Sequence, residues 1–214
     1  MTAELRQHRG RGRQAEARRN DRVVLDAARL VFAVHGPEAP MSAVAEAAGV
    51  GMGSLYRRFA SKAEMVQHLC EVSLAQQVSA AENALAGSGG PWQALAGFIG
   101  ECVSFRAGVF ASMAGTIPVT PAMTASAQRA HALLERLVMA AHEAGALRAD
   151  AGPVDVHYLI GLFSRRPPDD DQAYARLLGI ALDGLRAAGG RPLPGSPPDW
   201  AGYARRWAVP AGRN

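Results

Sequence analysis

Residues 41–65 read MSAVAEAAGVGMGSLYRRFASKAEM, and the small and apolar residues of this stretch are spaced as in two short helices that cross at a tight turn. Ala45 is small enough for a close crossing, Gly49 suits a left-handed turn that a side chain resists, and Leu55 points the second helix into a core. We therefore predict a helix-turn-helix whose second helix enters the major groove of DNA. The remaining buried positions are Val44, Ala48 and Val50, and the outward ones are Met52, Gly53, Ser54, Arg57 and Arg58.

The flanking residues predict the helices that support this motif. A first helix over residues 20–35 carries an apolar face and stops at Gly36-Pro37. Ser42 is expected to cap the second helix, which reaches about Ala48, and the third covers about residues 52–59. Residues 61–64, SKAE, form a capping box that opens a fourth helix reaching about Leu85. Such a helix of about 24 residues spans roughly 36 Å, which is long enough to carry a movement from one end of the molecule to the other.

The charge is concentrated at the N-terminal end. Residues 1–62 hold 11 Arg and Lys against 6 Asp and Glu, and residues 63–214 hold 12 against 13, so the two parts contribute +5 and −1 to the net charge of +4. A basic end on a nearly neutral body predicts a polyanionic partner for that end alone. The alternative is that the Arg-rich leader only keeps the chain soluble. If it binds DNA, the arm containing Arg9, Arg11, Arg13, Arg18 and Arg19 is expected in the minor groove.

The rest of the chain predicts further helices and an all-α fold. The expected segments are 91–107 with a short continuation over 108–114, then 121–144, 153–164 and 171–187, with one turn of helix near 200–207. The two helices at 153–187 carry more apolar surface than a small body can bury, which predicts a four-helix interface between two copies of the chain. The expected interface residues are Val156, Leu159, Ile160, Phe163, Tyr174, Leu177, Leu178, Ala181 and Leu185.

Large apolar side chains in the body suggest a ligand pocket of apolar or aromatic character, although each of them is equally at home in a helical core. Arg106 follows Phe105 in an apolar segment, where it faces either an anionic group of a ligand or solvent. Cys70 and Cys102 are expected to be buried free thiols. The candidate pocket residues are Trp92, Phe98, Phe105, Arg106, Phe110, Met113, Met123, His131 and Met139.

Between residues 21 and 69 the chain resembles the tetracycline-repressor (TetR) family of bacterial regulators. The resemblance rests on Phe32, Gly36, Ala45, Ala48-Gly49-Val50, Leu55-Tyr56, Phe59 and Ser61-Lys62. It implies an all-helical homodimer with a N-terminal helix-turn-helix domain, a long fourth helix and a C-terminal domain for ligand binding and dimerisation. It also implies that Tyr56 and Lys62 hold DNA phosphates. It further implies that the residues from Gly51 to Ser54 and Arg57 meet bases or nearby backbone. With Ser42 and Arg58 added, the predicted DNA contacts are Ser42, Gly51, Met52, Gly53, Ser54, Tyr56, Arg57, Arg58 and Lys62.

Lys62 supports this assignment independently, because it is the only lysine among 23 basic residues and stands at the start of a helix. That position normally favours an acidic residue, whereas a lysine beside free backbone N–H groups makes an anion site. Elsewhere the sequence departs from the family: Gly51, Met52 and Ala60 replace the more usual hydroxyl, lysine and proline. Two backbone contacts are thereby lost, and Arg58 and the N-terminal arm are candidates to restore the attraction.

Several other classes of function lack their motifs. No histidine pair has metal-binding spacing, no glycine-rich phosphate loop or nucleophile elbow occurs, and no apolar run is long enough to span a membrane. We therefore expect a cytoplasmic regulator without metal, cofactor or enzymatic activity, acting as a ligand-released repressor at a pseudo-palindromic operator. The alternatives are an activator without a ligand, or a helical carrier or enzyme. The expected divisions are a disordered arm at 1–19, a DNA-binding domain at 20–66, a ligand-binding and dimerisation domain at 67–188, and a Pro/Gly-rich tail at 189–214.

Overall fold

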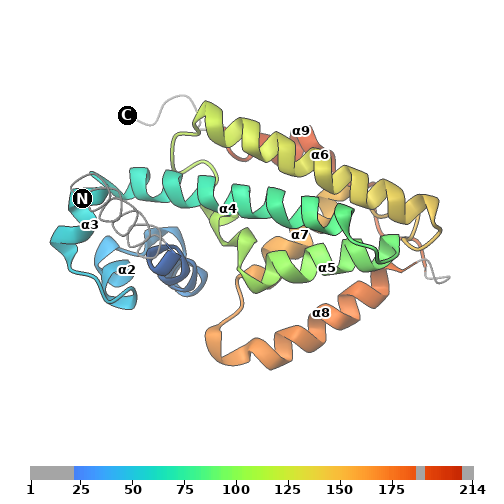
Figure 1. Cartoon of the computed structure of the whole chain (residues 1–214), viewed down its shortest axis with the longest axis horizontal. Helices are drawn as coiled ribbons and strands as arrows, with labels where there is room; N and C mark the ends of the chain where they lie inside the picture. The colour runs from blue at the N-terminus through green and yellow to red at the C-terminus, as the bar shows by residue number, and fades with distance from the viewer. Residues whose placement is uncertain (1–21, 187–190, 209–214) are drawn as a thin grey trace, which may run out of the picture.

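The computed structural model describes residues 22–186 and 191–208, and within these residues every regular element is helical (Figure 1). The long helix α4 (Lys62–Ala86) runs along the molecule, with a small helical unit at one end and the body packed along the rest. The predicted N-terminal arm and its arginines lie outside the described residues.

The small unit contains the N-terminal helix, described over residues 22–35, followed by the turn η1 (Gly36–Glu38), α2 (Met41–Ala47) and α3 (Met52–Arg58). Phe32, Val44 and Leu55 are each at most 2% exposed and hold the three helices together. Burying three such side chains stabilises the unit by several kcal/mol, at about 1.5–3 kcal/mol each. The helices predicted from the sequence are confirmed here to within one or two residues.

Helix α4 begins where the capping box predicts. The Ser61 hydroxyl accepts a hydrogen bond from the Glu64 amide at 3.1 Å, and the Glu64 carboxylate accepts one from the Ala60 amide at 2.8 Å. The first bond satisfies a helix N–H group that would otherwise lack a partner, whereas the second reaches Ala60, one residue before the N-cap, in place of the Ser61 amide that a capping box uses. The helix ends at Ala86, one residue beyond the expected end, and Gly87 follows it as the C-cap.

The body packs along α4 from about Gln67 onward. It contains α5 (Pro91–Ser104), η2 (Ala107–Met113), α6 (Pro121–Glu143), α7 (Pro153–Ser164), η3 (Pro168–Asp170), α8 (Asp171–Leu185) and α9 (Trp200–Arg205). Gly108 lets η2 cross α7 closely, since a Cβ there would lie 2.5 Å from Cα of Gly161. Instead of continuing α5 as a longer helix, the chain turns at Arg106, whose φ of 55° is left-handed, and forms a 3₁₀ helix.

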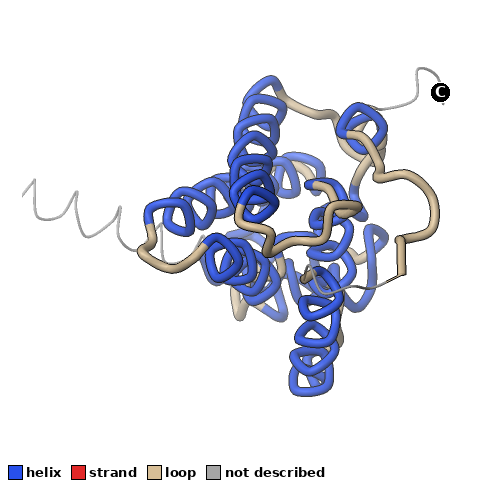
Figure 2. Tube along the Cα trace, turned by 90° about the vertical axis from the view of Figure 1, so that its right-hand side faces the viewer, coloured by secondary structure: helices blue, strands red, loops and turns tan. Residues whose placement is uncertain are grey.

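Two elements of the body lie on its outside. Helix α8 has no buried residue and runs along the edge of the body opposite α6 (Figure 1). Helix α9 also has no buried residue, and the loop over residues 191–199 runs around the outside of the bundle to reach it (Figure 2). The structure thus leaves an apolar face on α8 and a short helix laid over the body.

Candidate DNA interface and ligand cavity

The turn between α2 and α3 has the hydrogen bonds of a glycine-ended helix. The Val50 amide donates to the Ala45 carbonyl at 2.9 Å and the Gly49 amide donates to the Glu46 carbonyl at 3.0 Å. These are the two bonds of the Schellman motif, which needs a left-handed residue at its centre, and Gly49 has a φ of +64°. The expected role of Gly49 is confirmed, and the turn fixes the direction of α3.

The outer face of α3 is open to solvent. Leu55 points inward, and Met52 is half-buried against the core of the small unit. Residues 47–63 include three basic side chains and no acidic one, so this surface attracts an anion. The exposed residues of the predicted DNA-contact set are Ser42, Gly51, Gly53, Ser54, Tyr56, Arg57 and Arg58.

Ser42 does not cap α2, which corrects the expectation from the sequence. The N-cap residue is Pro40, no side chain accepts a hydrogen bond from the first turn, and the Ala43 amide bonds to the Pro40 carbonyl at 3.1 Å. Pro40 has the extended backbone conformation that is usual at an N-cap, so the helix begins one residue before Ser42. The Ser42 hydroxyl is therefore not committed to the helix end, and its proposed contact with DNA stays a prediction.

Lys62 is anchored at the junction of the small unit and α4. Its Nζ donates to the Pro37 carbonyl at 2.5 Å and lies 5.9 Å from the centre of the Phe32 ring. The carbonyl and the ring face both favour a positive charge. The ammonium group is thus held beside the amino end of α4, where we predicted an anion site.

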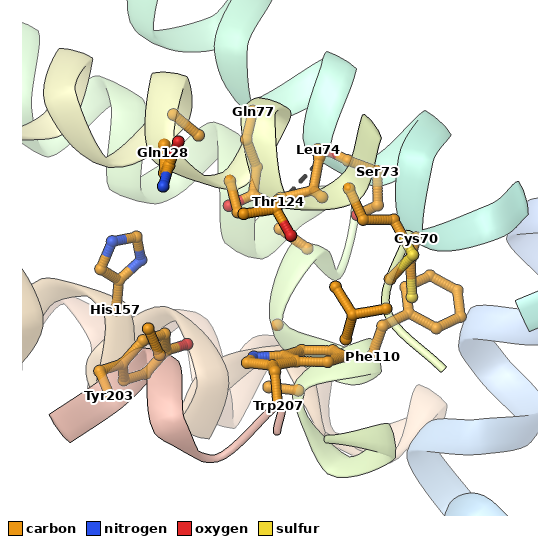
Figure 3. Close-up of a pocket in the computed structure, with 18 of the residues that line it drawn as sticks. Cys70, Ser73, Leu74, Gln77, Phe110, Thr124, Gln128, His157, Tyr203 and Trp207 are labelled. Atoms are coloured by element: carbon orange, nitrogen blue, oxygen red, sulfur yellow. Dashed lines mark hydrogen bonds between the residues drawn. The ribbon is translucent and has the colours of Figure 1, made fainter. Parts of the chain in front are cut away.

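A cavity of about 190 Å³ lies in the body between α4, η2, α6, α7 and α9. In Figure 3, Gln77, Leu74 and Thr124 stand on one side of it and Trp207 and Tyr203 on the other, with Phe110 and Cys70 at one end and His157 at the other. Its described lining is mostly apolar and includes no Asp, Glu, Lys or Arg. An uncharged, largely apolar molecule fits such a site.

Four aromatic rings are stacked at the α9 side of the cavity. The Trp200 ring lies 3.9 Å from that of His131, and the Tyr203 ring lies 5.1 Å from that of His157. The two histidines approach each other at 3.2 Å between Nδ1 of His131 and Nε2 of His157. Burial and then the neighbouring His131 lower the pKa of His157 to about 3. His157 is therefore neutral at neutral pH and offers a hydrogen bond without a charge.

Sequence reasoning placed the pocket only in part. Phe110 and Met123 line the cavity. Phe98 and Met113 are instead buried among other apolar side chains of the core, and Met139 is 57% exposed. Large apolar residues mark a core as readily as a pocket, so composition does not separate them. Trp92 and Phe105 pack away from the cavity, under Arg186 and Arg29 respectively. His131 does not line the cavity but stacks on Trp200, which does.

Arg106 has a structural role in place of the expected ligand contact. Its side chain is buried at the end of α5 and donates to the carbonyls of Ser164 and Arg166. It also lies 3.6 Å from the Asp171 carboxylate. Arg106 therefore ties α5 to the link between α7 and α8.

The predicted dimer interface needs correction. Val156, Ile160 and Phe163 are 1%, 3% and 6% exposed within the single chain, so they are unavailable to a partner. They face inward because this side of α7 packs against α5 and η2. On α7 and α8 the exposed large apolar residues are Tyr158, Leu162, Leu177 and Ile180, of which only Leu177 was predicted. The other predicted residues, Leu159, Tyr174, Leu178, Ala181 and Leu185, are half-buried against the body.

The remaining polar groups suggest no second kind of site. Cys70 and Cys102 are buried and free, as expected. In the described part of the chain, no three His, Cys, Asp or Glu side chains are grouped so that they could hold a metal ion. None of the helices searched in residues 22–186 and 191–208 is long and apolar enough to cross a membrane.

A helix-turn-helix with a basic outer face, joined by a long helix to a body with a cavity, defines a DNA-binding regulator. Residues 24–69 match the bacterial regulatory proteins of the TetR family, and residues 90–187 match the SbtR-like C-terminal domain of transcriptional regulators. The chain is also 30% identical to a solved TetR transcription regulatory protein from Mycobacterium vanbaalenii, covering 81% of this chain and 98% of that one with a TM-score of 0.55. The chain belongs to the TetR family.

Two further solved structures are similar. A TetR transcriptional regulator from Streptomyces coelicolor is 28% identical over 78% of this chain and 98% of that one, with a TM-score of 0.54. The TetR-like regulator LfrR from Mycobacterium smegmatis, solved in complex with proflavine, is 21% identical over 81% of this chain and 99% of that one and shares its fold, with a TM-score of 0.57. A comparison with curated proteins found no match. Family membership makes the chain a DNA-binding regulator and not an enzyme.

Proposed function

We propose that this regulator is a cytoplasmic repressor that binds a pseudo-palindromic operator as a homodimer and releases it when a small uncharged ligand, apolar or aromatic, fills the cavity. The observation that carries the proposal is that cavity and helix-turn-helix share one core. Phe110 lines the cavity and packs edge-on against Phe32 of the N-terminal helix, with ring centres 6.3 Å apart. A ligand that displaces Phe110 therefore presses on the helix that supports α3.

The long helix offers a second connection between the cavity and the DNA-binding unit. Cys70 and Ser73 of α4 line the cavity, and the Ser73 hydroxyl also accepts a hydrogen bond at 3.3 Å from Arg29 of the N-terminal helix. A shift of α4 around a ligand thus moves the small unit with it. In a dimer, such a tilt changes the distance between the two copies of α3, which must match successive major-groove faces about 34–36 Å apart.

Dimerisation is proposed through α7 and α8. Helix α8 has no buried residue, and its Leu177 and Ile180 are 51% and 61% exposed. Together with Leu162 of α7 these side chains form an apolar face that a second copy would cover. Two copies joined at this face would bring together the four-helix interface expected of such a dimer.

The test is a gel-shift measurement with the DNA upstream of the protein's own gene, with and without a panel of uncharged aromatic compounds. A repressor of this kind shifts the DNA at low protein concentration, and at least one compound reverses the shift. Specific binding that no compound affects would favour an activator or a regulator without a ligand. Binding of a compound without any DNA shift would favour a carrier and contradict the proposal.

A further inference from the structure

Helix α9 belongs to a C-terminal segment that lies beyond both matched family regions, which end at residue 187. The loop before it is fastened to the body at its beginning: the Leu193 amide donates to Asp150 Oδ2 at 2.7 Å, and Arg148 donates to the Arg191 carbonyl at 2.6 Å. Four prolines between residues 192 and 198 then stiffen the path to α9. We call residues 191–208 the C-terminal strap.

The strap presents an aromatic face to the cavity. Trp200, Tyr203 and Trp207 are spaced by three and four residues, which places them on one side of a helix, and all three line the cavity. Figure 3 shows Trp207 and Tyr203 opposite the α4 and α6 residues of the lining. Arg205 and Arg206, between them in sequence, are exposed.

The cavity is small when the strap is in place. A cavity of about 150 Å³ holds one benzene ring, and pockets for larger ligands have about 300–1,000 Å³. The volume of about 190 Å³ accommodates one ring system with few substituents. The cavity is partly open to solvent, so a larger ligand is enclosed in it only if one wall moves.

The strap is the wall that moves most easily. Helix α9 has six residues and no buried one, and so short a helix has little stability of its own. The walls from α4 and α6 belong to helices of 25 and 23 residues with several fully buried side chains each. Local opening occurs where few apolar groups are buried.

We propose that the C-terminal strap is a movable aromatic wall of the ligand site: Trp200, Tyr203 and Trp207 select an uncharged aromatic ligand by stacking, and α9 swings aside to admit any ligand larger than one ring system. This inference rests on the proposed ligand response and assigns its chemistry. The polar groups of Gln77, Gln128 and Thr124 offer hydrogen bonds from the α4 and α6 side of the cavity, and no side chain of the described lining would neutralise a charged ligand.

The test is a disulfide that holds the strap closed. A Cβ built at Gly152 lies 3.7 Å from the Cβ of Pro197, within the roughly 3.5–4.5 Å that a disulfide needs. Gly152 has an extended backbone with φ of −117°, so Gly152→Cys is tolerated, and Pro197→Cys supplies its partner. Cys70 and Cys102 are buried and do not compete for the new thiols.

Two uncharged probes are titrated into the oxidised and reduced double variant: indole, which fits the closed cavity, and N-phenyl-1-naphthylamine, which does not. Oxidation should lower the affinity for the larger probe by at least about tenfold, a change of roughly 1.4 kcal/mol. The affinity for indole should fall by less than about threefold. Adding Trp207→Ala to the oxidised variant should restore binding of the larger probe, because it removes the indole ring that fills the space. The single-cysteine variants, treated with the same oxidant, are the controls.

Equal effects of oxidation on both probes, or none on either, overturn the inference. So does a failure of the reduced protein to bind either probe. Far-ultraviolet circular dichroism and a gel shift on the same samples show whether the variants are folded. The gel shift also judges the proposed regulatory function separately, since operator binding by the free protein does not depend on how the strap moves.

Discussion

Lys62 belongs both to the predicted DNA-binding surface and to the junction between the small helical unit and α4. Its ammonium group rests on the Pro37 carbonyl at 2.5 Å, although it is the group assigned to a phosphate. The two roles are compatible, because an ammonium has three donors and the carbonyl takes one. The Pro37 contact then holds the lysine in position before DNA arrives, which lowers the entropic cost of the phosphate contact.

We expect Lys62→Ala to weaken binding to specific and unrelated DNA alike, because a phosphate contact carries no sequence information. The slope of log affinity against log salt should fall by about one unit. Tyr56→Phe should also weaken both, with a smaller change in slope because no charge is lost. Fluorescence anisotropy at several salt concentrations measures both effects. A folded Lys62→Ala variant with an unchanged slope would contradict the phosphate assignment.

The histidines beside α9 give the fold a dependence on pH. The pKa of His157 is lowered to about 3, from an ordinary value near 6.5 in the unfolded chain. As the pH falls below 6.5, the unfolded chain binds a proton that the folded chain excludes, so stability falls with acidification. Between pH 7 and pH 5 the loss should be at most about 2 kcal/mol, at roughly 1.4 kcal/mol per unit below 6.5.

Urea unfolding at the two pH values measures this loss, and His157→Gln should reduce it because the variant side chain does not titrate. Part of the loss should remain, since burial also lowers the pKa of His131. An equal loss in the variant and the original protein would show that other groups cause the acid sensitivity.

At the scale of helices, local chemistry predicts where an element begins and ends better than it predicts which neighbour covers it. The Ser61 cap and the left-handed turn at Gly49 are both confirmed because they depend on a few adjacent residues. The faces of α7 are different: apolar residues stand on most sides of this helix, so periodicity does not separate Val156, in the core, from Leu162, which is 58% exposed. The sequence also did not predict that α9 lines the cavity. Its aromatic residues lie in a Pro-rich tail, and nothing in the sequence shows which part of the body they pack against.

The exposed apolar face of α8 can be tested as the dimer interface with one charged substitution. Ile180→Arg should convert the dimer into monomers, because a second copy would bury the charge without a counter-charge. The single chain should remain folded, since Ile180 is 61% exposed within it. Met139→Arg on α6, at a position 57% exposed and away from α8, is the matched control and should stay dimeric. Sedimentation velocity distinguishes the two, and a dimeric Ile180→Arg variant would place the interface elsewhere.

Across the whole molecule, the DNA-binding unit and the cavity are connected by one packed core instead of a flexible hinge. The hydrophobic cluster that contains Phe32 and Leu55 also contains Phe110 and Met123 from the cavity wall. A packed core of this kind passes a displacement on, because close-packed side chains have little free space to absorb it. The effect of a ligand on operator binding should therefore depend on the side chains at this joint as well as on those that touch the ligand.

The last prediction is that Phe110→Leu separates binding from switching. In the original protein, a compound that releases the operator should bind about 5–150 times more weakly when operator is present, a coupling of roughly 1–3 kcal/mol that must be equal in both directions. Leucine keeps an apolar wall for the ligand but loses the edge-on contact of Phe110 with Phe32. We expect the variant to bind the compound alone and the operator alone much as the original protein does. The factor by which operator weakens binding of the compound should fall toward one. Titrations of the compound with and without operator measure it, with Met139→Leu as a control distant from the joint. A Phe110→Leu variant that keeps the full coupling would leave α4 and its Ser73 contact with Arg29 as the route from cavity to DNA.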